Sequence, residues 1–338
     1  MSDIKTYRLS FIVLIALLIV CFFTNISLGS VSISFGEIVN SLFGFSDNYI
    51  VQNYRLPKAI TAILVGSGLG VSGLLMQTLF RNPLAGPFVL GISSGASLGV
   101  AIVILGAGFF GGAFTALLVS KWSIVIAASL GSFLVLLAVL VVSTKVRDTM
   151  AILIIGLMFG SITAAVVSVL SYFSSAEQLQ QYIFWGFGSL GNLSWNELLI
   201  FSIIYGFGLL LSIISIKALN TLLLGENYAK SLGLNIKQNR LIIIVATSLL
   251  AGTITAFAGP IAFIGLAIPH IVRQIFTTSN HKILLPAILL LGAIVMLVCD
   301  SIAQLPTSDY TLPINAITSL FGAPVVIWLL IRKRKMMF

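Results

Sequence analysis

Charged residues are scarce in this sequence. Only 8% of its 338 residues are Asp, Glu, Lys or Arg, and 59% are hydrophobic. Soluble domains carry about 25% charged residues, so the chain lacks the charged surface that a soluble fold of this size requires. Apolar stretches of about 20 residues, long enough to cross a bilayer, recur along its whole length. We therefore predict an all-α, polytopic membrane protein.

Cysteine and histidine are also nearly absent. Cys21 and Cys299 each lie within an apolar stretch, which excludes a disulfide framework and any metal-ligand spacing. The two histidines, His270 and His281, lie near a predicted helix end and are interpreted as polar residues at the membrane interface. We predict no metal site and no haem ligation.

Motifs for nucleotide hydrolysis and catalysis are missing. No glycine is followed by lysine, so there is no P-loop, and neither a nucleophile elbow nor a paired carboxylate motif occurs. Asp300 is the one acid that we count within a predicted span. Ion-coupled carriers usually keep acids at membrane depth, so a secondary transporter is the less favoured alternative. We expect a pathway that is not itself an enzyme and is driven by a separate ATPase.

The apolar stretches predict ten membrane spans and an orientation. Of 18 Lys and Arg residues, only Arg55, Lys58 and Lys121 fall outside if the N-terminus is cytoplasmic. Short cytoplasmic loops carry such an excess, so we predict that both termini are cytoplasmic and that the net charge of +9 reflects topology and not nucleic-acid binding. The spans are expected near residues 9–28, 57–79, 90–110, 122–142, 150–172, 196–217, 240–258, 261–276, 283–303 and 314–331.

A Gly-Pro break divides the longest apolar stretch. One helix over 240–276 would be about 55 Å long, well beyond a bilayer core of about 30 Å, so two spans must meet at Gly259-Pro260. The sequence Ala258-Gly259-Pro260 also echoes Ala85-Gly86-Pro87, and each precedes an apolar run. The two copies face opposite sides in the predicted topology, as an inverted repeat would.

Two segments outside the spans are long enough to fold. Residues 34–43 are expected to form a short helix on the outer side. Residues 218–239 lie on the cytoplasmic side, and apolar residues recur at helical spacing over 222–232, with Gly225 and Gly233 as punctuation. Such a segment can dock a partner or lie on lipid headgroups.

Five ordered motifs, covering almost the whole chain, resemble the FecCD family of importer permeases for iron–siderophore complexes, haem and cobalamin. They are Arg55-Leu56-Pro57-Lys58; Arg81-Asn82-Pro83-Leu84-Ala85 with 90–96; 224–233; 259–266 with Ile268-Pro269-His270; and Leu312-Pro313-Ile314 with Gly322-Ala323-Pro324.

The resemblance implies a single permease domain of ten helices over residues 1–338. It implies a second permease chain, expected to form a homodimer, two ATP-binding cassette ATPase subunits and an extracytoplasmic binding protein, all at the bacterial cytoplasmic (inner) membrane in contact with lipid. The chain itself would hold no cofactor, because ATP would be bound by the partner subunit. An iron–siderophore complex is the expected cargo, with haem or cobalamin as alternatives.

The resemblance also implies residue roles. We call residues 218–239 the coupling segment, and they would receive the motion of the ATPase. Glu226 within it could also serve as an acid at the start of a helix, where the helix dipole favours it. Arg55 and Lys58 would dock the binding protein, or alternatively anchor a span, and Gln304 stands where the family often has a further arginine. The coupling residues are Leu224, Gly225, Glu226, Ala229, Leu232 and Gly233; the cytoplasmic gate candidates are Asn82, Leu84 and Thr149.

Overall fold

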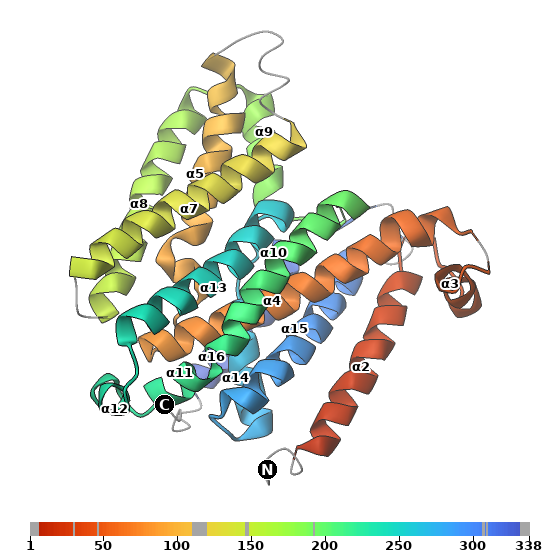
Figure 1. The fold of residues 1–338 in the computed structure, drawn as a ribbon. Coiled ribbons are helices and arrows are strands. Elements are labelled where there is room, and N and C mark those ends of the chain that lie inside the picture. The colour runs from red at the N-terminus through yellow and green to blue at the C-terminus, as the bar shows by residue number, and fades with distance from the viewer. Residues whose placement is uncertain are drawn as a thin grey trace.

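The chain folds as a bundle of helices (Figure 1). The computed structural model describes residues 7–29, 31–45, 47–109, 120–145, 149–191, 193–305, 308 and 310–331, and no strand occurs in these ranges. A helix stands at each of the ten predicted spans, so the all-α prediction is confirmed. These helices are α2 (Arg8–Ser27), α4 (Leu56–Phe80), α5 (Ile92–Ile104), α7 (Lys121–Lys145), α8 (Thr149–Tyr172), α10 (Trp195–Ile214), α13 (Ile236–Ala258), α14 (Ile264–Phe276), α15 (His281–Ala303) and α16 (Ile314–Ile331).

The ten helices differ in length. Seven of them are long and apolar enough to cross a membrane, whereas α5, α14 and α16 are shorter apolar helices. The 13 residues of α5 or α14 rise about 20 Å, less than a bilayer core of about 30 Å. The predicted spans at 90–110 and 261–276 were therefore too long, because α5 ends at Ile104 and a separate short helix η3 (Gly106–Phe109) follows it, whereas non-helical chain at 261–263 precedes α14.

Helix α4 is the centre of the bundle, and α13, α14 and α15 pack around it. Glycines make these contacts close. A Cβ atom added to Gly66 would collide with the carbonyl oxygen of Gly292 on α15, and one added to Gly73 would collide with that of Gly265 on α14. Small residues allow helix backbones to approach in this way where lipid supplies no hydrophobic driving force.

The two Ala-Gly-Pro motifs occupy matching places in the fold. Helix α13 ends at Ala258 as predicted, Gly259 takes φ 78°, and the 13-residue α14 follows. Helix α4 likewise precedes the Ala85 copy, a short turn η2 (Pro87–Leu90) and the 13-residue α5. The C-terminal end of α4 and the N-terminal end of α13 both adjoin residues 222–226, so the two units run in opposite directions. This arrangement is that of an inverted repeat.

Shorter helices lie at the two ends of the bundle. Helix α3 (Phe35–Leu42) is the short helix expected at 34–43, and it starts with a capping box between Ser34 and Glu37. Helix α9 (Ala176–Gly186) was not predicted. Helix α11 (Ile216–Leu222) leads into the coupling segment, and α12 (Glu226–Ser231) lies within it.

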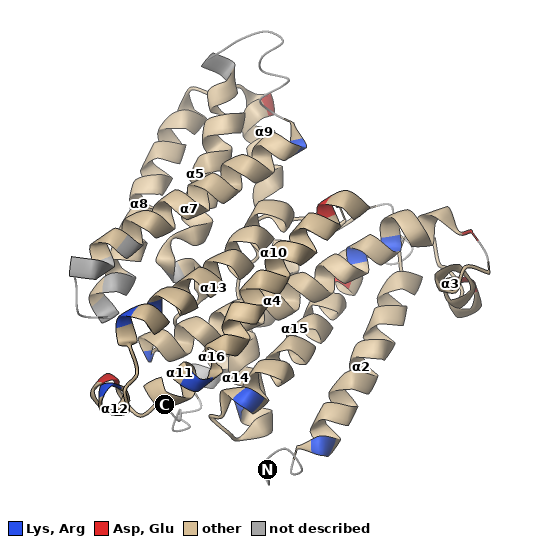
Figure 2. Ribbon diagram, in the orientation of Figure 1, with Lys and Arg blue, Asp and Glu red and all other residues tan. Residues whose placement is uncertain are grey.

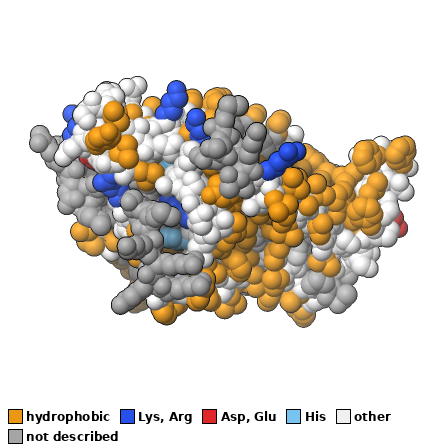
Figure 3. Space-filling model, turned by 90° about the horizontal axis from the view of Figure 1, so that it is seen from below, with side chains coloured by type: hydrophobic (Ala, Val, Ile, Leu, Met, Phe, Trp, Pro, Cys, Tyr) orange, Lys and Arg blue, Asp and Glu red, His pale blue; other side chains and the backbone are white. Residues whose placement is uncertain are grey.

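Cationic side chains gather at one end of the bundle. We call the end that carries Arg8, Arg81, Arg240 and the coupling segment the basic end; it is the lower end in Figure 2 and faces the viewer in Figure 3. Arg55, Lys58 and Lys121 lie at the opposite end, as the charge pattern predicted. Which end is cytoplasmic stays a prediction.

Candidate functional site at the basic end

The coupling segment consists of two short helices joined by a sharp turn. Helical spacing predicted a helix over 222–232, but the chain turns at 223–225 and α12 begins only at Glu226. Gly225 takes φ 110° and Gly233 takes φ 83°, conformations that a side chain would oppose. The two glycines therefore mark the two ends of α12.

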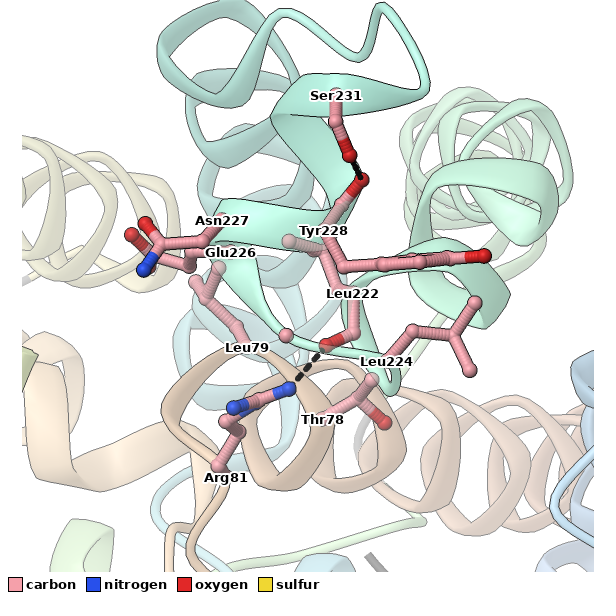
Figure 4. Close-up of a pocket in the computed structure, with 10 residues that line it drawn as sticks. Thr78, Leu79, Arg81, Leu222, Leu224, Glu226, Asn227, Tyr228 and Ser231 are labelled. Atoms are coloured by element: carbon pink, nitrogen blue, oxygen red, sulfur yellow. Dashed lines mark hydrogen bonds between the residues drawn. The ribbon is translucent and has the colours of Figure 1, made fainter.

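Apolar side chains of the coupling segment point away from the bundle. Leu224, Tyr228 and Leu232 are 62%, 55% and 60% exposed, whereas Ala229 between them is fully buried. Leu224 and Tyr228 line a pocket of about 730 Å³ between α12 and the end of α4 (Figure 4). Exposed apolar side chains gathered around a hollow are typical of a surface that binds another protein.

Glu226 fixes α12 to the next helix. Its carboxylate accepts a hydrogen bond from Arg240 Nη2 at 2.9 Å and forms an ion pair with it. Glu226 is also the first residue of α12, where the helix dipole favours an acid. Two interactions therefore orient this helix before any partner binds.

Arg81 joins the end of α4 to the coupling segment. Its Nη2 donates to the carbonyl oxygen of Leu222 at 2.7 Å (Figure 4) and to that of Leu223 at 3.1 Å. These carbonyls belong to the last residue of α11 and to its cap, and the carbonyl of Leu222 also accepts from Gly225 N at 3.1 Å. The guanidinium thus caps one helix from the end of another.

A buried histidine makes a second connection. His281 Nε2 lies 2.9 Å from Thr78 Oγ1, and Nδ1 lies 2.7 Å from Asn220 Oδ1. Asn220 on α11 also donates to Asn280. The prediction that His281 is an interfacial residue was wrong, because the side chain is fully buried among these polar partners of α4 and α11.

The loop 81–86 holds two of the three gate candidates. Asn82 Oδ1 accepts from Leu84 N at 2.9 Å, so both belong to one tight turn, and Leu84 is exposed. His270 on α14, also predicted to be interfacial, is nearly buried and bonds the carbonyl of Pro83 at 2.8 Å. Thr149 is the first residue of α8, and its side chain lies outside the described residues. The gate assignment stays a prediction.

The predicted docking residues form one network at the opposite end. Arg55 Nη1 donates to Gln304 Oε1 at 2.9 Å, and Gln304 Nε2 donates to Asp300 at 2.7 Å. Lys58 pairs with the other carboxylate oxygen of Asp300 at 3.2 Å, and Asn25 donates to Asp300 at 2.9 Å. The amide of Gln304 suits this place, because an arginine there would face Arg55 with a second positive charge.

Burial limits what this network can offer to a partner. The Arg55 side chain is nearly buried and also donates to the carbonyl of Val31, whereas the Lys58 side chain is 21% exposed. Of the three predicted docking residues, Lys58 is therefore the one that a partner can reach most easily. The docking role itself stays a prediction.

A second acid also lies within a span. Glu197 stands in the first turn of α10, is nearly buried, and pairs with Lys121 at 2.7 Å. The count of Asp300 as the single acid within a span was therefore wrong. Both acids lie at helix ends and are paired, so the argument against a proton relay at mid-depth is unchanged.

Sequence reasoning missed most of the connections at the basic end. The sequence indicated Arg81 only as part of a motif, and it predicted no role for Thr78 or Asn220. Their signal was weak, because a polar residue near the end of an apolar helix is ordinarily an interfacial residue. Only the packing of α11 against α4 and α15 brings them together.

Comparison with known proteins gives consistent matches over nearly the whole chain. The family model of the FecCD transport family matches residues 17–332. The hemin transport system permease HmuU of Yersinia pestis is 35% identical over 323 residues, covering 95% of each chain. The vitamin B12 import system permease BtuC of Klebsiella pneumoniae is 38% identical over 285 residues, covering 84% of this chain and 83% of its own.

A solved structure matches as well. It is described as an inward-facing conformation of a metal-chelate type ABC transporter, and it is 32% identical in sequence. It superposes with a TM-score of 0.81 and covers 97% of this chain and 100% of its own. The match therefore extends to the arrangement of the helices.

Proposed function

The chain belongs to the FecCD transport family and is a multi-pass ABC importer permease of the metal-chelate type, and from this we propose that it carries an iron complex, foremost an iron–siderophore, across the bacterial inner membrane. In this proposal two copies of the chain form the pathway. Two ATPase subunits bind at the basic end, which is cytoplasmic together with both termini, and they hold the ATP. The chain itself carries no cofactor.

The observation that carries this proposal is the exposed apolar surface of the coupling segment. Leu224, Tyr228 and Leu232 lie beyond the spans on a segment that Glu226 holds to α13, so they are well placed to receive an ATPase subunit. Side chains on a segment that is already held in place lose little conformational entropy when a partner protein binds to them. The ATPase would therefore push on a segment that transmits its displacement.

The opposite end would receive a binding protein that delivers the cargo. Lys58, with Arg55 and Gln304 behind it, offers positive charge beside a pocket of about 350 Å³ that Asp300 also lines. Paired surface charges steer such docking and set its register. Because Asp300 already neutralises Lys58, we expect the approach of an acidic partner to exchange one ion pair for another.

Haem and cobalamin are the alternative cargoes. Relatives named for hemin and vitamin B12 transport are similar over most of the chain, and hemin, vitamin B12 and an iron–siderophore are all metal ions held in bulky organic chelates. No described pathway residue favours one of the three, so the uptake experiment includes all of them.

Reconstituted uptake tests the proposal. The chain is purified from its host with the ATPase and binding-protein subunits that accompany it and is placed in lipid vesicles. We expect the chain alone to hydrolyse no ATP, and the complex to import a ferric siderophore only with ATP and binding protein. The measurements are phosphate release, vesicle-associated iron for the ferric siderophore and for haem, and vesicle-associated cobalt for cyanocobalamin.

Each result of this experiment has a distinct meaning. Uptake driven by a proton or sodium gradient without ATP would contradict the importer. ATP-dependent uptake of haem or cyanocobalamin in preference to the siderophore would overturn the cargo and leave the ATP-driven mechanism intact. Vesicles with the ATPase omitted provide the matched control.

Charge reversal at Glu226 tests the coupling segment. Glu226→Arg places two cations together at Arg240, and because juxtaposed like charges cost several kcal/mol, we expect the affinity for the ATPase subunit to fall about tenfold or more. The measurement is the amount of ATPase that co-purifies with the chain. Glu177→Arg, at an exposed acid in the first turn of α9, should leave it unchanged.

A charge swap separates two ways in which Glu226 can act. If Glu226→Arg combined with Arg240→Glu restores co-purification, Glu226 acts by holding α12 in place. If the swap does not restore it, the carboxylate contacts the ATPase itself. Normal co-purification in the single Glu226→Arg variant would count against a coupling role for this segment.

A further inference from the structure

We propose that Arg81 is the positioning residue that transmits displacement of the coupling segment to the loop 81–86, and so to the gate candidates Asn82 and Leu84. The inference rests on the proposed function, because it names the part that carries the motion of the ATPase into the pathway.

The backbone of Arg81 adopts a conformation that favours glycine. Arg81 caps the C-terminal end of α4 with φ 48° and ψ 35°, in the left-handed region. Helices commonly end in this conformation on a glycine, which adopts it without steric cost. An arginine persists in such a place only when its surroundings hold it there, and strain of this kind gathers at functional sites.

The backbone at Arg81 is bonded to the end of α4, through Arg81 N to Thr78 O and Asn82 N to Gln77 O, and its side chain is held by the coupling segment. Within the described residues, the hydrogen bonds from the loop 81–86 to this part of the chain are the two from Arg81 to the carbonyls of Leu222 and Leu223. Gly225 lies directly beside the guanidinium, since a Cβ atom on it would be 3.5 Å from Arg81 Nη2. The turn at 223–225 and the end of α4 therefore move together for as long as these bonds hold.

Beyond Arg81 the loop is braced as a short unit. Ala85 N bonds the carbonyl of Asn82 at 3.0 Å, in addition to the Asn82 bond to Leu84 N. Pro83 bonds His270 on α14 through its carbonyl. A loop braced internally passes a displacement on as a rigid piece, and Leu84 is the exposed side chain at its tip.

The other polar connections of the coupling segment lead elsewhere. Glu226 pairs with Arg240 on α13, and Asn220 bonds His281 on α15. Thr78 reaches His281 from within α4, one turn before the loop. Arg81 is thus the side chain that belongs to the loop and bonds the coupling segment directly.

Arg81→Gly is the variant that tests this inference. Glycine fits the left-handed backbone, so the fold should be kept or slightly stabilised, while both bonds to α11 are lost. In vesicles with the ATPase and binding protein, we expect ATP hydrolysis near the wild-type rate and cargo import reduced about tenfold, within the range of ordinary coupling between sites. The measurement is the ratio of ATP hydrolysed to cargo imported.

Two further variants show whether the guanidinium is responsible. Thr277→Gly relieves the same kind of backbone strain, because Thr277 caps α14 at the basic end with φ 30° and ψ 37°, and it should leave the ratio unchanged. Arg81→Lys keeps a cationic donor and should give an intermediate ratio. A role confined to stability would change the amount of folded complex and not this ratio.

The outcomes that overturn the inference differ from the one that overturns the proposed function. A wild-type ratio in Arg81→Gly would overturn the inference and leave the importer intact. Loss of ATPase co-purification in Arg81→Gly would also overturn it, because Arg81 would then build the docking surface. A wild-type complex without ATP-dependent import would overturn the proposed function, and the inference with it.

Discussion

Replacing Asp300 by alanine is expected to lower the free energy of unfolding by about 3–5 kcal/mol, because removing one partner of a buried ion pair leaves the other uncompensated. Asp300 is 3% exposed in its side chain and accepts from Lys58, Gln304 and Asn25. The change would leave one ammonium group and two amide donors without their acceptor. The measurement is chemical unfolding in detergent micelles.

Matched variants test whether the loss of stability comes from the buried ion pair of Asp300. Asp47→Ala removes an exposed acid and should leave the unfolding midpoint unchanged. Asp300→Leu combined with Lys58→Met should recover part of the loss, since an apolar pair can replace a buried ion pair at little cost. An Asp300→Ala protein as stable as the wild type would mean that the network contributes nothing to the fold.

Replacing Gly73 by valine is expected to prevent α14 from packing on α4. The added Cβ would collide with the backbone carbonyl of Gly265, which cannot move aside as a flexible side chain can. Overpacking of a core typically lowers the free energy of unfolding by about 1–3 kcal/mol, and we expect a collision with backbone to cost at least as much as the upper end of this range. We expect little folded protein to be recovered, as measured by size-exclusion chromatography in detergent.

Gly206→Ala provides the matched control for that prediction. Gly206 lies in α10 with nothing within 4 Å of an added Cβ. Alanine there should stabilise the helix by about 0.5–1 kcal/mol, since glycine in a helix interior is the weaker helix former. Normal recovery of Gly73→Val would show that α4 and α14 can separate without loss of the fold.

The local signals in the sequence predicted most of the helices. Length and apolar composition are properties of each stretch alone, and they located all ten span helices. The Gly259-Pro260 break was also predictable, because one helix over 240–276 would exceed the thickness of the bilayer. The shortness of α5 and α14 was not predictable, since the chain that follows α5 and the chain that precedes α14 are themselves apolar.

The candidate site was predicted only in outline. The glycines at 225 and 233 and the acid at 226 indicated a cytoplasmic helix, and the structure places a short one between them. The polar partners at these sites are distant in sequence. Arg55 and Gln304 are 249 residues apart, Arg81 and Leu222 are 141 apart, and His281 and Thr78 are 203 apart. Such pairings depend on how the helices pack, which the local patterns of composition and periodicity do not reveal.

Helix α14 also bears on how the protein enters the membrane. With 13 residues that include Pro269, His270 and, in the last turn, Arg273, it is a poor candidate for release into lipid on its own, because a helix needs about 20 apolar residues to span a bilayer. Arg273 Nη1 donates to Gln77 Oε1 on α4, which is synthesised 196 residues earlier. Helix α4 would therefore already be in the bilayer when α14 reaches the translocon. It would act as the template on which α14 integrates.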